Sequence, residues 1–128
     1  MANQVLIVDD DEAVLTMLYK VIRSNGIDAD TASNGMKALE LVSQKTYDLI
    51  LLDINMHGMD GFEVIHEIRR RKINVPIIVV SGRKEDYDML YGLDIGADDY
   101  VTKPFNPLEL IANKRKRGRK KIKRLRKK

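Results

Sequence analysis

Apolar and polar residues follow one another in short blocks that predict five strands separated by helices. Strand candidates are runs of apolar or β-branched residues, whereas helix candidates repeat an apolar residue every three or four positions. The expected strands cover residues 4–8, 28–32, 48–52, 76–80 and 99–102, the second being the least apolar. Strands that alternate with helices in this way favour an α/β fold, with a parallel sheet covered by helices on both faces.

Four segments between these strands have helical spacing. Their apolar positions are Val14, Leu18, Val21 and Ile22, then Ala38, Leu39 and Val42, then Phe62, Ile65 and Ile68, and finally Met89, Leu90 and Leu93. Turn residues indicate where two of them end, at Asn25-Gly26 and at Gly96, and the third ends in the basic run 69–72. A fifth helix is expected to begin at Pro107.

Polar side chains stand where four of the expected strands end. Asp9 and Asp10 follow the first strand, Asp53 the third, Ser81 the fourth and Lys103 the fifth. Parallel strands bring their carboxyl ends to one edge of the sheet, where proteins of this architecture bind ligands. We therefore expect three carboxylates, a hydroxyl and an ammonium group to converge in one shallow cleft.

This convergence predicts a magnesium-dependent phosphoryl site. Three adjacent carboxylates repel one another, and Mg²⁺ is a cation with oxygen ligands that suits an open site. With Lys103 and Ser81 beside it, Asp53 can accept a phosphoryl group as an acyl phosphate. Hydrolysis of phosphate esters is the enzymatic alternative, but no general base is positioned for it. The structural alternative is that Asp9 and Asp10 only cap the first helix.

Charge divides the chain into an acidic body and a basic tail. Of the 23 Lys and Arg residues, 12 lie in residues 114–128, which hold no acid, and 11 share residues 1–113 with all 19 Asp and Glu. The body therefore has a net charge of −8 and the tail of +12, although the whole chain has only +4. The two parts require separate interpretations.

Four motifs occur in order along the body: VLIVDDD, LLDINMHGMDG, VVSGRKED and GADDYVTKPF. Together they resemble the receiver domain of response regulators, the phospho-accepting part of two-component signalling. The resemblance covers roughly residues 3–112 and implies a receiver domain over 1–113. It further implies a flavodoxin-like, doubly wound sheet of five parallel strands in the order 2-1-3-4-5, with helices on both faces.

The resemblance assigns metal and acceptor roles by position. Asp53 matches the phospho-acceptor, which also ligates the metal. Asp10 matches the direct Mg²⁺ ligand, Asp9 the ligand that acts through water, and Asn55 the residue whose backbone carbonyl completes the set. The side-chain types at Asn55 and Arg83 affect how long the phosphoryl group survives in this family.

The resemblance also assigns the residues of a conformational switch. Ser81 matches the hydroxyl that binds the phosphoryl group, and Lys103 matches its cationic partner. Tyr100 matches an aromatic rotamer switch, although a half-buried tyrosine on a strand is the structural alternative. The peptide bond before Pro104 is expected to be cis, as it is in the family.

The implied function is that of a signalling switch, not of an enzyme with an external substrate. A histidine kinase or phosphotransfer protein supplies the phosphoryl group, and Asp53 accepts it with Mg²⁺. The new charge draws Ser81 inward, Tyr100 turns in, and the face of the fourth helix, fifth strand and fifth helix changes. Asp98, Asp99 and Glu109 resemble acids of a homodimer interface on that face, but Met89 and Tyr91 stand where a basic partner is common.

His57 is the visible departure from the family, in which proline is usual at this position. A residue other than proline frees the backbone and adds a donor, so a more mobile loop is expected. His57 is also close in sequence to Asp53, and its charged imidazole would favour an anionic phosphoryl group there. The structural alternative is an ordinary surface loop residue, and His66 on the third helix is expected to be structural or exposed to solvent.

The tail, residues 114–128, has four interpretations. It is a solvated segment, a linker or extension of the fifth helix, a segment that binds DNA or another polyanion, or an artefact of cloning. It contains no aromatic residue, so stacking on bases is not expected, and any nucleic-acid binding would be non-specific.

Other features of the sequence suggest a cytoplasmic protein. The chain contains no cysteine, which fits a reducing compartment. Its first residues, MANQVLIVDDD, are unlike a signal peptide because they become acidic at once. No apolar run approaches the ~20 residues that a membrane-spanning helix needs, so no membrane association is expected.

Overall fold

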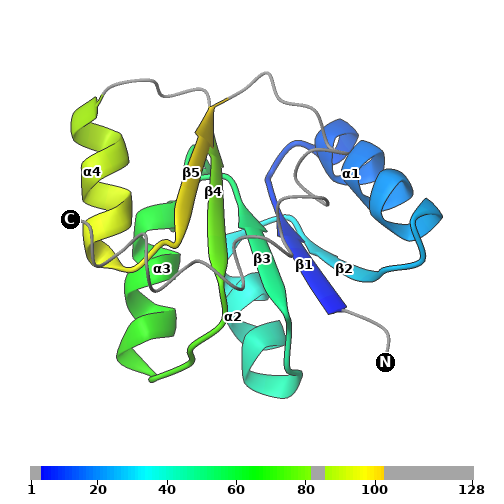
Figure 1. Cartoon of the computed structure of the whole chain (residues 1–128), viewed down its shortest axis with the longest axis horizontal. Coiled ribbons are helices and arrows are strands. Elements are labelled where there is room, and N and C mark those ends of the chain that lie inside the picture. Colours follow the sequence, from blue (N-terminus) through cyan, green and yellow to red (C-terminus); the bar gives the residue numbers. More distant parts are fainter. Residues whose placement is uncertain (1–3, 82–85, 103–128) are drawn as a thin grey trace.

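Five parallel strands form one sheet at the centre of the computed structural model, which describes residues 4–81 and 86–102 (Figure 1). The strands are β1 (Gln4–Val8), β2 (Asp28–Ala32), β3 (Leu49–Leu52), β4 (Ile77–Ser81) and β5 (Asp99–Thr102). The helices are α1 (Glu12–Ser24), α2 (Gly35–Gln44), α3 (Gly61–Arg70) and α4 (Asp86–Ile95). The predicted alternation of strands and helices is confirmed over the described residues.

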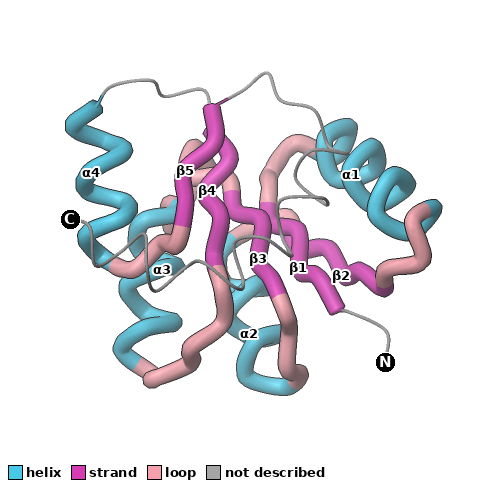
Figure 2. The backbone as a smooth tube through the Cα atoms, in the orientation of Figure 1, coloured by secondary structure: helices cyan, strands magenta, loops and turns pink. Residues whose placement is uncertain are grey.

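The strand order is β2-β1-β3-β4-β5, and every neighbouring pair is parallel (Figure 2). The order reverses between β1 and β3, which is where doubly wound sheets place their ligands. The register pairs Val8 with Leu52 and Ser81 with Thr102, so these four strands end close to one line. The predicted order 2-1-3-4-5 is confirmed.

Side chains of alternate strand residues form two separate apolar clusters, one on each face of the sheet. On one face, Ile7 and Leu51 pack with the α1 residues, including Leu18. On the other face, Leu6 and Ile50 pack with residues of α2 and α3, and Leu93 of α4 lies against the same cluster. The central strands are therefore buried on both faces, which explains their continuous apolar runs.

Asp11 caps helix α1, not Asp9 or Asp10. Its side chain accepts hydrogen bonds from the backbone N–H groups of Ala13 and Val14. The interpretation of Asp9 and Asp10 as the helix cap is therefore wrong. Because Asp11 satisfies the helix terminus, the two preceding carboxylates can serve another purpose.

The remaining differences from the predicted elements are small. β3 begins at Leu49, one residue later than expected, and β4 is shifted by one residue so that it includes Ser81. In α1, Leu15 is buried while Val14 and Val21 are only partly buried. The expected fifth helix and residues 114–128 lie outside the described residues.

Candidate functional site

Charged and polar side chains are buried at the carboxyl edge of the sheet. In the described part of the chain, the buried polar or charged residues are Asp9, Asp53, Ser81 and Asp99. The first three come from the ends of β1, β3 and β4, and the sequence predicted all three as site residues. Buried polar and charged groups are costly unless they are paired, so their concentration at one edge makes it the candidate functional site.

The carboxylates of Asp9, Asp10 and Asp53 lie close enough to share one cation. Each offers one oxygen, and these oxygens lie within 4.8 Å of one another. Two carboxylates at this separation repel by roughly 3 kcal/mol at an effective dielectric constant of about 20, so a positive counter-charge is required. All three donors are hard oxygens and Asp10 is partly exposed, so the set fits Mg²⁺, which keeps several waters.

The loop after β3 holds the Asp53 carboxylate in a defined orientation. The backbone N–H of Asn55 donates to Oδ1 of Asp53 at 3.1 Å. Where the loop ends, Gly61 packs so closely that a Cβ there would lie 2.5 Å from Cα of Ile54 and 2.8 Å from the carbonyl oxygen of Asp53. The glycine is therefore required by close backbone approach beside the site.

The side chain of Asn55 reaches across to β4. Its Nδ2 donates to Oγ of Ser81 at 3.2 Å, and Ser81 is fully buried. The sequence predicted a role for the backbone carbonyl of Asn55 but not this side-chain contact. Nothing in the sequence pattern specified it, because the two residues are 26 positions apart.

His57 contacts Asp10, which the sequence also did not predict. Nδ1 of the imidazole lies 2.8 Å from Oδ2 of Asp10, and the backbone N–H of His57 donates to the same oxygen at 3.1 Å. The hydrogen bond from the ring, followed by the one from the backbone, lowers the pKa of the Asp10 carboxyl from its ordinary value. His66, by contrast, is exposed on α3, as expected.

Tyr100 lies inside the structure, next to helix α4. Its side chain is only 6% exposed, and a Cβ added to Gly92 would lie 3.3 Å from its ring. Tyr100 pairs with Val79 in the sheet, two residues before Ser81. This places the tyrosine on the strand next to the site. Lys103, Pro104 and Arg83 lie outside the described residues, so their predicted roles stay predictions.

Asp98 makes contacts within the chain. Its Oδ2 accepts hydrogen bonds from the backbone N–H of Ile77 at 2.8 Å and from Nη2 of Arg69 at 3.2 Å. The same guanidinium donates to the carbonyl oxygens of Gly96 and Ile73. Asp98 is therefore part of the link between α3 and the turn before β5, which is a structural role besides any role in a dimer.

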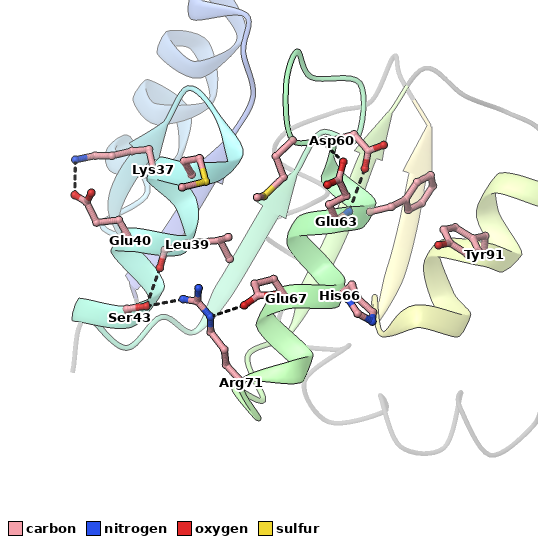
Figure 3. A pocket seen from close by; sticks show the side chains of 13 residues that line it. Lys37, Leu39, Glu40, Ser43, Asp60, Glu63, His66, Glu67, Arg71 and Tyr91 are labelled. Carbon is pink, nitrogen blue, oxygen red and sulfur yellow. Dashed lines mark hydrogen bonds and ion pairs between the residues drawn. The ribbon is translucent and has the colours of Figure 1, made fainter.

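A surface groove of about 1000 Å³ lies between α2, α3 and Tyr91 of α4 (Figure 3). It is separate from the cluster of Asp9, Asp10 and Asp53. Its charged groups largely pair with one another, as Lys37 does with Glu40 and Arg71 with Glu67. The groove includes none of Asp9, Asp53 and Ser81, so its size does not make it the functional site.

None of the helices among the described residues is long and apolar enough to cross a membrane.

Comparison with sequence families gives a match to a known domain. The sequence family described as the response regulator receiver domain matches residues 5–115 of the chain. The chain is also 40% identical over 112 residues to the alkaline phosphatase synthesis transcriptional regulatory protein PhoP of Bacillus subtilis (strain 168). That alignment covers 88% of this chain and 47% of PhoP, so the chain spans about half the length of this relative.

Solved structures share the same fold. The receiver domain of the Francisella response regulator 1452 is 35% identical, with a TM-score of 0.84, over 88% of this chain and 93% of that one. A CheY-like response regulator receiver domain protein from Methanospirillum hungatei JF-1 is 26% identical, with a TM-score of 0.87, over 97% and 99% of the two chains.

Proposed function

Because this chain belongs to the response regulator receiver domain family of two-component signalling, we propose that Asp53 accepts a phosphoryl group from a histidine kinase or phosphotransfer protein. The observation that carries this proposal is the position of Asp53, buried at the end of β3 with Asp9, Asp10 and Ser81 around it. Three carboxylates held this close together repel one another. A site that receives an anion with a metal ion explains all of them.

The transfer exchanges one bond to phosphorus for another. An oxygen of ionised Asp53 bonds to the phosphorus of a phosphohistidine, and the P–N bond breaks with its electron pair on the imidazole nitrogen. The product is an acyl phosphate on Asp53 and a histidine on the donor, which leaves as a neutral imidazole because the other ring nitrogen of the phosphohistidine carries a proton. The protein thus promotes its own phosphorylation and slow dephosphorylation, as a signalling protein and not as an enzyme acting on an external substrate.

Asp9, Asp10, Asp53 and the backbone carbonyl of Asn55 are the residues that would hold Mg²⁺. When bound, the ion supplies positive charge beside the phosphoryl oxygens. The N–H of Asn55 keeps the acceptor carboxylate oriented through Oδ1. Lys103 follows directly after β5, which ends in register with Ser81, and we assign its ammonium group to the phosphoryl oxygens.

Phosphorylation changes the protein through Ser81 and Tyr100. The phosphoryl oxygens are acceptors for the Ser81 hydroxyl. In the proposed switch Ser81 changes its rotamer to reach them, and this movement takes Oγ away from the Asn55 amide that donates to it. Tyr100 lies on the adjacent strand against α4, so a shift of β4 is transmitted to α4 and β5. The output is a changed surface at α4, β5 and the expected fifth helix, where a kinase, an effector or a second copy of the chain would bind.

Mass spectrometry after treatment with acetyl phosphate and Mg²⁺ tests the proposal. The wild-type protein is expected to gain the mass of one phosphoryl group, and Asp53→Asn is expected to gain none. Asp48→Asn is the matched control, because Asp48 stands just before β3 at the opposite edge of the sheet, exposed to solvent. Equal labelling of Asp53→Asn and the wild type would show that Asp53 is not the acceptor.

Binding of DNA or another polyanion is a second function, favoured by the charge of residues 114–128. The twelve cations of this segment would neutralise phosphates and make the affinity depend steeply on salt. Deletion of residues 114–128 is expected to remove both the affinity for DNA and its salt dependence, while phosphorylation of Asp53 continues. Unchanged DNA binding by the truncated chain would exclude this role of the tail. A cytoplasmic location agrees with both functions.

A further inference from the structure

His57 connects two loops that carry the proposed metal site. Its backbone N–H and its imidazole both contact Oδ2 of Asp10, at 3.1 and 2.8 Å. The two residues are 47 positions apart, since Asp10 follows β1 and His57 lies in the loop between β3 and α3. One oxygen of Asp10 is therefore fastened to the loop that carries Asp53 and Asn55.

The arrangement leaves the imidazole in solvent. The His57 side chain is fully exposed, and the Asp10 side chain is about a quarter exposed, at 25%. A surface loop histidine without a role would be expected to sample many rotamers in water. Here the ring lies within hydrogen-bond distance of one carboxylate, and the main chain of the same residue contacts that carboxylate as well.

We propose that His57 is a positioning residue that fastens the β3–α3 loop to Asp10 and competes with a divalent cation for the Asp10 carboxylate. This inference rests on the proposed function, in which Asp10 is a metal ligand. Two donors occupy lone pairs of Oδ2, so a cation that uses this oxygen must displace at least one of them. Metal binding therefore weakens the attachment of the loop, and the attachment weakens metal binding.

The size of the effect follows from the exposure of the contact. Pairs between exposed groups are weak because water screens them, so the contact lowers metal affinity without preventing binding. Removing the imidazole by His57→Ala is expected to strengthen Mg²⁺ binding about two- to fivefold. His57→Pro removes the backbone N–H as well and is expected to strengthen binding further.

Calorimetric titration with Mg²⁺, at one fixed pH and ionic strength, measures these affinities. The expected order, from strongest to weakest, is His57→Pro, His57→Ala and the wild type. His66→Ala is the matched control, since it removes the only other histidine of the chain, which is exposed on α3. The control is expected to bind Mg²⁺ as the wild type does. Affinities of His57→Ala and His57→Pro that equal or fall below that of the wild type would overturn the inference.

Imidazole NMR signals give a second measurement, independent of affinity. Because the chain has two histidines, its spectrum contains two imidazole Hε1 signals, one from each ring, and the His57→Ala variant assigns them. Addition of Mg²⁺ is expected to shift the His57 signal and to leave the His66 signal in place. An unmoved His57 signal in a protein that binds Mg²⁺ would also overturn the inference.

Failure of this inference is distinguishable from failure of the proposed function. If the wild type binds Mg²⁺ and is phosphorylated on Asp53, but the variants at His57 behave like it, only the role of His57 is wrong. If the wild type binds no Mg²⁺ in calorimetry, the metal site is wrong and the role of His57 fails with it.

Discussion

The amide of Asn55, in the loop after β3, donates to the hydroxyl of Ser81 at the end of β4, with Nδ2 and Oγ 3.2 Å apart. Ser81 is fully buried, whereas Asn55 is exposed, so a solvent-facing side chain holds a buried one. The proposed switch requires Oγ of Ser81 to move toward a phosphoryl group on Asp53 and away from Nδ2 of Asn55. The hydrogen bond from Asn55 therefore stabilises the unphosphorylated arrangement.

Asn55→Ala is expected to speed phosphorylation of Asp53. The variant loses the hydrogen bond to Ser81 but keeps the backbone carbonyl proposed as a metal ligand. A net hydrogen bond is worth about 1 kcal/mol, so the initial rate with acetyl phosphate should rise by roughly fivefold, as followed by mass spectrometry. Asn74→Ala, at an exposed position before β4, should leave the rate unchanged. A rate for Asn55→Ala at or below that of the wild type would contradict this account.

Gly61→Ala is expected to disturb both the stability and the site. The new Cβ would lie 2.5 Å from Cα of Ile54 and 2.8 Å from the carbonyl oxygen of Asp53, so backbone atoms must move. Such overpacking costs about 1–3 kcal/mol of unfolding free energy, measurable by urea denaturation, and the displaced Asp53 should be phosphorylated more slowly.

Gly26→Ala separates these two effects. Gly26 has φ = 77° and open space around it, so an added Cβ strains the backbone without any contact. This variant should lose about 1 kcal/mol of stability yet keep the wild-type rate of phosphorylation. If Gly61→Ala and Gly26→Ala were phosphorylated equally fast, close packing at Gly61 would not be positioning Asp53.

Arg69→Met is expected to lower the free energy of unfolding more than Arg70→Met does. Arg69 donates to the carbonyl oxygens of Gly96 and Ile73 and to Asp98, all in partly buried positions. Methionine preserves the apolar stem but removes the guanidinium that donates to the two carbonyl oxygens and one of the donors to Asp98, at a cost of about 2–3 kcal/mol in urea denaturation. Arg70→Met, at an exposed pair, should change the stability by less than about 1 kcal/mol. Similar losses for both variants would show that the link between α3 and Gly96 adds no stability.

The fold could be predicted from the sequence because its pattern is strongly periodic. β1, β2 and β5 have the predicted bounds, and the continuous apolar run Leu49–Leu52 is the kind that only a strand buried on both faces requires. The shift of β4 to include Ser81 has a physical cause. A serine after an apolar run indicates the start of a loop, but here Ser81 pairs with Thr102 of β5, so β4 continues to Ser81.

The residues of the candidate site could be proposed from the sequence, but their contacts could not. Asp9, Asp53 and Ser81 were recognisable because polar residues follow apolar strands at one edge of a parallel sheet. The contacts Asn55–Ser81 and His57–Asp10 join residues 26 and 47 positions apart. They depend on the path of the β3–α3 loop and on side-chain rotamers, and neither leaves a periodic signal in the sequence. The assignment of the helix cap to Asp11 depends on backbone geometry in the same way.

Glu67 is expected to make the stability depend on pH below the ordinary range of carboxylates. Hydrogen bonds from Arg70 and then from Arg71 lower the pKa of its carboxyl to about 2. A folded pKa below the unfolded value stabilises the protein at higher pH, and the contribution is lost as the pH falls through the folded pKa.

The free energy of unfolding of the wild type should therefore exceed that of Glu67→Gln at about pH 6, and the difference should shrink between about pH 4.5 and about pH 2. Urea denaturation across this range measures the difference, with Glu40→Gln, whose exposed carboxylate meets a single lysine at 3.4 Å, as the control. A difference between the wild type and Glu67→Gln that stays constant over the whole range would show that the two arginines do not stabilise the ionised carboxylate.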